Sequence, residues 1–164
     1  MLNVGTIESR KNLEVVVKAL PKVNLPLVVL GKKTSYYTNT ILPLIKELNL
    51  ENRVTFLENF SLEGLPLLYQ GASVFIYPSK FEGFGIPVLE ALYSKTPVIT
   101  SNSSSLKEIG KHSLLFDQKN SNELVHLINN EVENYDIEKA YKYALTFSAQ
   151  NQADQIHNIY KNVR

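Results

Sequence analysis

The sequence predicts an α/β protein built on a doubly wound, Rossmann-like parallel sheet of about six strands, with helices on both faces. The 164-residue chain is 44% hydrophobic, which is enough to bury one sizeable core in a single domain, residues 1–164. Short runs of apolar residues alternate about six times with segments whose apolar residues recur at helical spacing. Continuously apolar strands indicate a parallel sheet covered on both faces, and right-handed crossovers then make it doubly wound.

Each predicted strand is a short apolar run. The first two, residues 2–4 and 27–30, end at Gly5 and Gly31. The others are expected at residues 54–57, 74–77, 97–100 and 114–116. Ligands of such sheets bind beyond the carboxyl ends of the strands. We therefore expect the residues that follow the strands to share one edge, namely Thr6, Gly31, Glu58, Pro78 and Ser101.

Helices are expected between these strands. The first, residues 13–20, has apolar residues at helical spacing and is closed by Pro21. The second, residues 41–48, contains Pro43, which must lie in the first turn or kink the helix. The remaining helical segments are predicted at residues 62–69 (capped by Ser61), 85–93, 105–109 and from 121 onward.

The segment from Glu82 to Glu90 is the most informative for function. It follows the predicted strand 74–77, passes through a loop with two glycines and enters a helix whose first turn suits Pro87. The N–H groups at such a helix start favour an anion, for example a diphosphate. Glu90 lies about four residues, or roughly 6 Å, into that helix. Two lone glutamates are most often surface residues, but the order strand, loop, helix favours a binding site.

Arg10 and Lys11 form the second informative feature. They lie between the first predicted strand and its helix, at the edge where ligands are expected. A guanidinium and an ammonium there would neutralise a diphosphate. Taken alone, two adjacent basic residues are more often part of the solvated surface.

Both features resemble a known family. The stretch Pro-Ser-Lys-Phe-Glu-Gly-Phe-Gly-Ile-Pro-Val-Leu-Glu-Ala-Leu (78–92) is similar to the Glu-x7-Glu signature of retaining glycosyltransferases with the GT-B architecture, family 4 in particular. Residues 5–12 resemble the Gly-Thr-x-x-x-Arg-Lys-Asn stretch of the same enzymes. Further similar segments make the resemblance nearly continuous from Gly5 to about Asp117. It implies the C-terminal, nucleotide-binding half of a two-domain enzyme, whose N-terminal acceptor domain is absent from this chain.

The resemblance also implies an activity. The domain would bind a GDP-, UDP- or ADP-linked sugar for retaining, metal-independent hexosyl transfer, of a mannosyltransferase-like kind, to a glycan or lipid-linked acceptor in polysaccharide biosynthesis. No cofactor is implied, and the chain alone is expected to be an inactive fragment. Lys11, Arg10 and Glu82 are the implied catalytic residues, with the basic pair on the diphosphate and Glu82 on the sugar hydroxyls. The other implied binding residues are Glu90 (on the ribose), Thr6, Asn59, Phe60, Phe84, Gly85 and Ile86.

Composition argues against several other functions. The formal net charge is only +1, without a basic run, so nucleic-acid binding has little electrostatic support. The chain has no cysteine, no Asp-x-Asp and no Gly-x-Gly-x-x-Gly, which argues against thiolate metal sites, a metal-held diphosphate and a dinucleotide cofactor. His112, His126 and His157 lack ligand spacing. We expect a cytoplasmic protein that reaches the inner face of the membrane only through the missing domain.

Two alternatives remain at this stage. The chain could be a non-catalytic nucleotide-sugar-binding module or partner subunit, or belong to another GT-B enzyme such as an epimerase or a phosphorylase. The C-terminal tail, residues 150–164, is expected to cross toward the absent domain, whereas in a complete small protein it would pack on its own sheet. In either case its apolar residues should be covered, namely Ile156, Ile159, Tyr160 and Val163.

Overall fold

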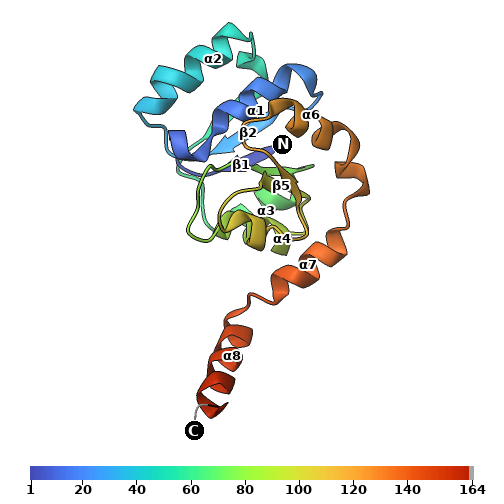
Figure 1. Ribbon diagram of the computed structural model, residues 1–164. Coiled ribbons are helices and arrows are strands. Elements are labelled where there is room, and N and C mark those ends of the chain that lie inside the picture. Colours follow the sequence, from blue (N-terminus) through green and yellow to red (C-terminus); the bar gives the residue numbers. More distant parts are fainter. Residues whose placement is uncertain (163–164) are drawn as a thin grey trace.

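The computed structural model describes residues 1–162 and contains one six-stranded, all-parallel sheet. Its strand order is β3-β2-β1-β4-β5-β6, which confirms the predicted doubly wound fold (Figure 1). The order reverses between β1 and β4, so consecutive crossovers turn to opposite faces there. The strands are β1 (Leu2–Val4), β2 (Leu27–Leu30), β3 (Val54–Leu57), β4 (Phe75–Tyr77), β5 (Val98–Ser101) and β6 (Leu114–Phe116).

Helices cover both faces of the sheet and create two separate cores. The first core contains α1 (Leu13–Ala19), α2 (Leu42–Glu47) and α6 (Ser121–Asn130), which appear together in the upper part of Figure 1. The second contains residues of α3 (Leu65–Gln70), α4 (Ile86–Tyr93), α5 (Leu106–Ile109) and α7 (Ile137–Leu145). Successive side chains of a strand point to opposite faces of the sheet, so neighbouring residues lie in different cores. In β4, Ile76 lies in the first core, and Phe75 and Tyr77 lie in the second. Shorter helical turns lie at Ser9–Lys11, Leu20–Lys22, Tyr37–Ile41, Glu51–Arg53 and Val132–Asn134.

Two predictions about helix starts, at Pro43 and at Ser61, have different outcomes. The sequence predicted that Pro43 lies in the first turn of its helix or kinks it, and the structure places Pro43 in the first turn of α2. Ser61 does not cap α3, which was the prediction, because that helix begins only at Leu65, after Gly64. The hydroxyl of Ser61 instead accepts a hydrogen bond from the Gly64 N–H (3.2 Å) and closes the preceding turn.

The last helix, α8 (Ala149–Asn162), leaves the domain after α7 and has no buried residue. Figure 1 shows it pointing away from the sheet. Three of the four apolar residues predicted to need cover are exposed, Ile156 by 55%, Ile159 by 63% and Tyr160 by 73%. The fourth, Val163, lies outside the described residues. Residues 149–162 therefore do not pack on the sheet of this chain.

Two glycines allow the loops at the carboxyl edge to approach closely. A Cβ at Gly31 would lie 1.9 Å from the carbonyl oxygen of Gly5, so the turns after β1 and β2 meet backbone to backbone. Gly85, at the start of α4, has φ of +108° and would place a Cβ 2.7 Å from Leu106. Only glycine adopts that conformation without strain.

We predict that Gly31→Ala lowers the free energy of unfolding by at least about 2 kcal/mol, because the two backbone turns must separate. Urea unfolding of the purified chain measures the change. Gly83→Ala is the matched control, because no atom lies within 4 Å of the Cβ it would add. Equal stabilities of the two variants would contradict this account of the close approach.

Candidate functional site

The candidate site lies at the carboxyl edge of the sheet, where the strand order reverses. The loop after β1 carries Arg10 and Lys11, and the loop after the neighbouring strand β4 carries Glu82. The two loops touch directly, since the N–H of Lys80 donates to the carbonyl oxygen of Arg10 at 2.8 Å. Residues 71 positions apart in sequence can therefore share one site.

The three predicted catalytic residues are in direct contact. The Nζ of Lys11 lies 2.8 Å from Oε1 of Glu82, and Nη1 of Arg10 lies 3.0 Å from the same oxygen. The side chains of Lys11 and Glu82 are only 15% and 11% exposed, whereas that of Arg10 is 44% exposed. Arg10 also pairs with Glu8 at 2.7 Å. The positive charges of Lys11 and Arg10 are thus paired with the carboxylates of Glu82 and Glu8 in a partly buried cluster.

Tyr77, which the sequence analysis did not select, completes this cluster. Its ring is 1% exposed, and its hydroxyl lies 2.6 Å from Nζ of Lys11 and 3.1 Å from Oε1 of Glu82. Burial raises the pKa of Tyr77 despite the opposing charge of Lys11. The phenol therefore keeps its proton, accepts from Lys11 and donates to Glu82. Its position as the last residue of β4, next to the edge where ligands are expected, was the one available sequence signal.

The same contacts set the ionisation of the pair. Burial by itself raises the pKa of the Glu82 carboxyl, but the hydrogen bond and charge of Lys11 act in the opposite direction together with further hydrogen bonds such as that of Tyr77, so the pKa lies below its ordinary value. Burial likewise opposes the charge of Lys11, and the contacts with Glu82 and Tyr77 still raise the pKa of its ammonium. Both groups are charged at neutral pH.

Serines of the loop after β5 hold the backbone of Glu82. Ser104 Oγ accepts from the Glu82 N–H at 3.1 Å, and the hydroxyl of Ser105 donates to the Glu82 carbonyl at 2.9 Å. The sequence analysis did not select these serines. Their contribution depends on a contact more than twenty residues away along the chain, which no local pattern indicates.

Thr6, Asn59 and Phe60 line one pocket of about 620 Å³ beyond β1, β2 and β3. This volume is in the range of small-molecule sites. The backbone of Gly5, which also lines the pocket, lies against the side chain of Lys11, because a Cβ there would be 3.5 Å from Cε. The pocket and the ion cluster are therefore neighbours along one edge.

Glu90 lines an adjoining pocket of about 440 Å³, which shares Leu62 and Leu65 with the first. Its Oε2 accepts a hydrogen bond from the hydroxyl of Tyr69 at 2.8 Å. Tyr69 is 1% exposed and edge-on to Phe75, so its position is fixed by the second core. Sequence reasoning missed Tyr69, because its helical spacing is that of any core residue.

Phe84, Gly85 and Ile86 surround the start of α4, as predicted. Gly85 is buried, whereas Phe84 and Ile86 are 42% and 60% exposed. Within residues 1–162, no protein acceptor pairs with the N–H groups of these three residues, and no side chain caps the helix. Such donors, together with the positive end of the helix dipole, suit an anion.

Asn12 ties this part of the site together. It is 5% exposed, adopts a left-handed conformation at φ of 57° and precedes α1. Its Nδ2 donates to the carbonyl oxygens of Pro78 at 3.1 Å and of Gln118 at 2.9 Å. One amide thus joins the loops after β1, β4 and β6.

Residues 1–162 contain no group of three or more His, Asp or Glu side chains placed to hold a metal ion. Nor does any helix in that part of the chain combine the length and the apolar character needed to cross a bilayer.

A doubly wound domain with a charged cluster at its switch point has the architecture of domains that bind nucleotides at this edge. Residues 1–147 match the family model described as "Glycosyl transferases group 1". The chain therefore belongs to the group 1 glycosyl transferase family, as its sequence motifs predicted.

Curated relatives agree with this assignment. The chain is 36% identical over 114 residues to the O-antigen chain mannosyltransferase B of Escherichia coli, a match that covers 66% of this chain and 30% of the relative. It is 31% identical over 149 residues to the N-acetylgalactosamine-N,N'-diacetylbacillosaminyl-diphospho-undecaprenol 4-alpha-N-acetylgalactosaminyltransferase of Campylobacter jejuni, which covers 87% and 40%. The chain thus spans less than half the length of these relatives.

Solved structures of other proteins have the same fold. Anabaena HepE, in a complex with UDP and glucose, superposes with a TM-score of 0.83 at 21% identity, over 98% of this chain and 48% of that one. The C-terminal domain of the group 1 protein LpcC from Francisella tularensis gives a TM-score of 0.74 at 23% identity, over 89% and 84%. These likenesses confirm the predicted C-terminal half of a GT-B enzyme as the fold, while the ligand roles of individual residues stay predictions.

We predict that Glu82 makes the stability of the chain depend on acid. Its pKa is lower in the folded state, so its contribution is fully present above the ordinary pKa of 4.5 and is lost as the pH falls through the folded-state value. At pH 7, Glu82→Gln should cost about 1–2 kcal/mol of unfolding free energy, since it removes a charge-assisted hydrogen bond.

Urea unfolding of both proteins between pH 7 and pH 3 measures this effect. The difference between parent and variant should shrink on acidification. Glu47→Gln is the control, because Glu47 is exposed and forms no ion pair among the described residues. A constant difference across the pH range would refute the linkage.

Proposed function

We propose that the chain is the donor-binding half of a retaining glycosyltransferase and takes a nucleotide-diphosphate sugar at the edge between β1 and β4. The observation that carries this proposal is the contact of Lys11, Arg10 and Glu82 across the strand-order reversal. The available N–H groups at the start of α4 lie in the same loop as Glu82. Titration of the purified chain with GDP-, UDP- and ADP-sugars tests the proposal directly.

The donor would extend along this edge. Lys11 and Arg10 bind the diphosphate together with the N–H groups of Phe84, Gly85 and Ile86. The nucleoside occupies the pocket that Thr6, Asn59 and Phe60 line, and Glu90 accepts hydrogen bonds from the ribose hydroxyls. The diphosphate then competes with Glu82 for the Lys11 ammonium, which releases the Glu82 carboxylate toward the sugar hydroxyls.

Catalysis would proceed by stabilising the leaving group. The cations and the helix start concentrate positive potential where the departing diphosphate gains charge. The acceptor hydroxyl attacks from the same face of the sugar, which retains the configuration. Because these groups provide the positive field, the reaction needs no divalent metal.

The main part of the acceptor site lies outside this chain. We propose hexosyl transfer, with mannose as the first candidate sugar, in polysaccharide biosynthesis. The relative that is 36% identical is named an O-antigen mannosyltransferase, and the one that is 31% identical is named for a diphospho-undecaprenol acceptor. A lipid-linked acceptor would place the whole cytoplasmic enzyme at the inner face of the membrane.

We predict that Glu90→Gln weakens nucleoside-diphosphate binding by roughly 1–3 kcal/mol, because a charge-assisted hydrogen bond to the ribose is lost. Tyr69→Phe should have a smaller effect in the same direction, since Tyr69 positions the Glu90 carboxylate. Calorimetry with a nucleoside diphosphate and with its 2′,3′-dideoxy counterpart separates this role from folding. Neither substitution should weaken binding of the dideoxy compound.

Tyr141→Phe is the matched control for Tyr69→Phe. Tyr141 lies on α7, lines neither pocket and has its ring 4.8 Å from Nζ of Lys95. Equal affinities of parent and Glu90→Gln for the ribose-containing nucleotide would remove Glu90 from the site.

We predict that donor binding is independent of divalent metal. Affinity measured by calorimetry with excess chelator should equal that measured with magnesium, because Lys11 and Arg10 supply the charge. Arg10→Gln should weaken binding under both conditions alike. A loss of about tenfold or more on chelation, equivalent to 1.4 kcal/mol, would count against a metal-free site.

We predict that the purified 164-residue chain binds nucleoside diphosphate weakly and transfers no sugar. The physical reason is that the acceptor wall of the cleft belongs to the N-terminal half, whose addition should restore transfer. A radiolabelled-sugar transfer assay measures both. Transfer by this chain alone would refute the fragment hypothesis, and failure to transfer after addition of the missing half would favour a non-catalytic binding module.

A further inference from the structure

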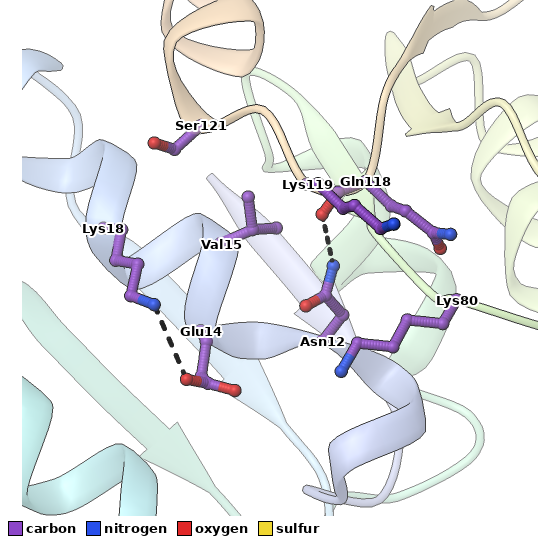
Figure 2. Close-up of a pocket in the computed structure, with 8 residues that line it drawn as sticks. All are labelled: Asn12, Glu14, Val15, Lys18, Lys80, Gln118, Lys119 and Ser121. Carbon is purple, nitrogen blue, oxygen red and sulfur yellow. Dashed lines mark hydrogen bonds and ion pairs between the residues drawn. The ribbon is translucent and has the colours of Figure 1, made fainter.

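A third pocket opens at the carboxyl edge of the sheet, on the face covered by α1 and α6. Its volume is about 350 Å³, and it shares no lining residue with the pockets of Thr6 and Glu90. Figure 2 shows its wall, built from α1, the loop after β4 and the loop that leads from β6 into α6. The lining residues are Asn12, Glu14, Val15, Lys18, Lys80, Gln118, Lys119 and Ser121.

This pocket concentrates positive charge. Three lysines line it, from three separate segments, against the single carboxylate of Glu14, although the whole chain carries a net charge of only +1. Within residues 1–162, Lys80 and Lys119 form no ion pair. The Glu14 carboxylate is occupied by the hydroxyl of Tyr36 and by Lys18 at 3.7 Å.

Two other carboxylates, in the loop before α6 and in its first turn, accept hydrogen bonds from backbone groups. Oε2 of Glu123 accepts from the N–H of Asp117 at 2.9 Å, and Oδ1 of Asp117 accepts from the N–H of Lys119 at 2.9 Å. Neither residue lines the pocket. Ser121 is the first residue of α6, a ten-residue helix, so the positive end of its dipole adds to the field of the lysines.

A buried amide adds a different recognition group. The Asn12 side chain donates two hydrogen bonds, both from Nδ2, and these fix the orientation of the carboxamide. Figure 2 shows its nitrogen toward the Gln118 carbonyl and its oxygen on the side of Val15. Asn12 is 5% exposed, so Oδ1 presents an acceptor from a rigid wall of the pocket. An acceptor there suits a hydroxyl group of a ligand and not a bare anion.

We propose that this pocket binds a sugar that carries a phosphate or carboxylate group. Lys80 and Lys119 pair with the anion, as lysines commonly do with phosphate. Asn12 Oδ1 accepts from a sugar hydroxyl, and the methyl groups of Val15 contact the apolar face of the ring. The pocket volume falls in the range of small-molecule sites, which begins at about 300 Å³.

The location gives this ligand a role, which rests on the proposed function. Asn12 directly follows Lys11, and Lys80 comes two residues before Glu82, so the pocket adjoins the catalytic cluster on the side away from the nucleoside pocket. An acidic sugar bound there is therefore a second substrate group, the anionic part of the acceptor, and not part of the donor.

Calorimetry of the 164-residue chain with glucose 6-phosphate, glucuronate, glucose and inorganic phosphate tests the proposal. At least one of the two acidic sugars should bind at least about tenfold more tightly than glucose and than inorganic phosphate. Comparison of the two acidic sugars identifies whether phosphate or carboxylate is preferred. The double variant Lys80→Gln/Lys119→Gln should lose at least about tenfold in that affinity.

Lys46→Gln/Lys142→Gln is the control, because it makes the same change in charge at exposed helix positions away from the pocket. It should bind like the parent, and a saturating nucleoside diphosphate should not displace the acidic sugar. The proposal is overturned if neither acidic sugar saturates the chain, if inorganic phosphate binds as tightly, if both double variants lose affinity equally, or if the nucleotide displaces the sugar.

Titration of the same samples with a nucleoside diphosphate keeps the two proposals separate. Nucleotide binding without acidic-sugar binding leaves the donor site and removes this pocket. Acidic-sugar binding that depends on Lys80 and Lys119, without nucleotide binding, keeps the pocket as a site and removes the proposed donor function.

Discussion

The pairing of Lys11 with Glu82 is the contact on which the rest of the site depends. It joins two loops that leave neighbouring strands and turn to opposite faces of the sheet. The partners are nearly buried, and the protonated Tyr77 hydroxyl bonds to both. A charged pair in such surroundings is costly unless its remaining hydrogen-bonding groups are satisfied. The serines that hold the Glu82 backbone and the amide of Asn12 supply that support.

This arrangement links stability to binding. In the structure each cation already has a carboxylate partner, so the proposed diphosphate would have to replace a protein contact as well as add its own charge. In the proposed binding mode, this exchange would lower the net gain from the phosphate and would free Glu82 for the sugar. Because the charges of Lys11 and Arg10 are already paired in the absence of a ligand, the folded state is also more stable than it would be with two unpaired, partly buried cations.

The edge of the sheet is divided by the turn that carries Arg10, Lys11 and Asn12. On one side lie the two adjoining pockets of Thr6 and Glu90, and on the other lies the basic pocket with Lys80 and Lys119. The proposed donor site would account for the first side. The proposed acidic-sugar site would give the second side a matching role, with the reacting groups between them.

The sequence by itself determined the fold, because continuously apolar runs and helical spacing are local patterns that survive without tertiary context. All six strands and the positions of Arg10, Lys11, Glu82 and Glu90 at one edge followed from it. Only the tertiary structure decided which residues support them. The hydrogen bonds between Tyr77 and Lys11, between Tyr69 and Glu90 and between Ser104 and Glu82 each join residues more than 20 positions apart in the sequence. The hydrogen bond from Asn12 to Gln118 spans 106 positions. Ser61 failed as a helix cap because α3 begins only at Leu65, a residue that packs against the second core.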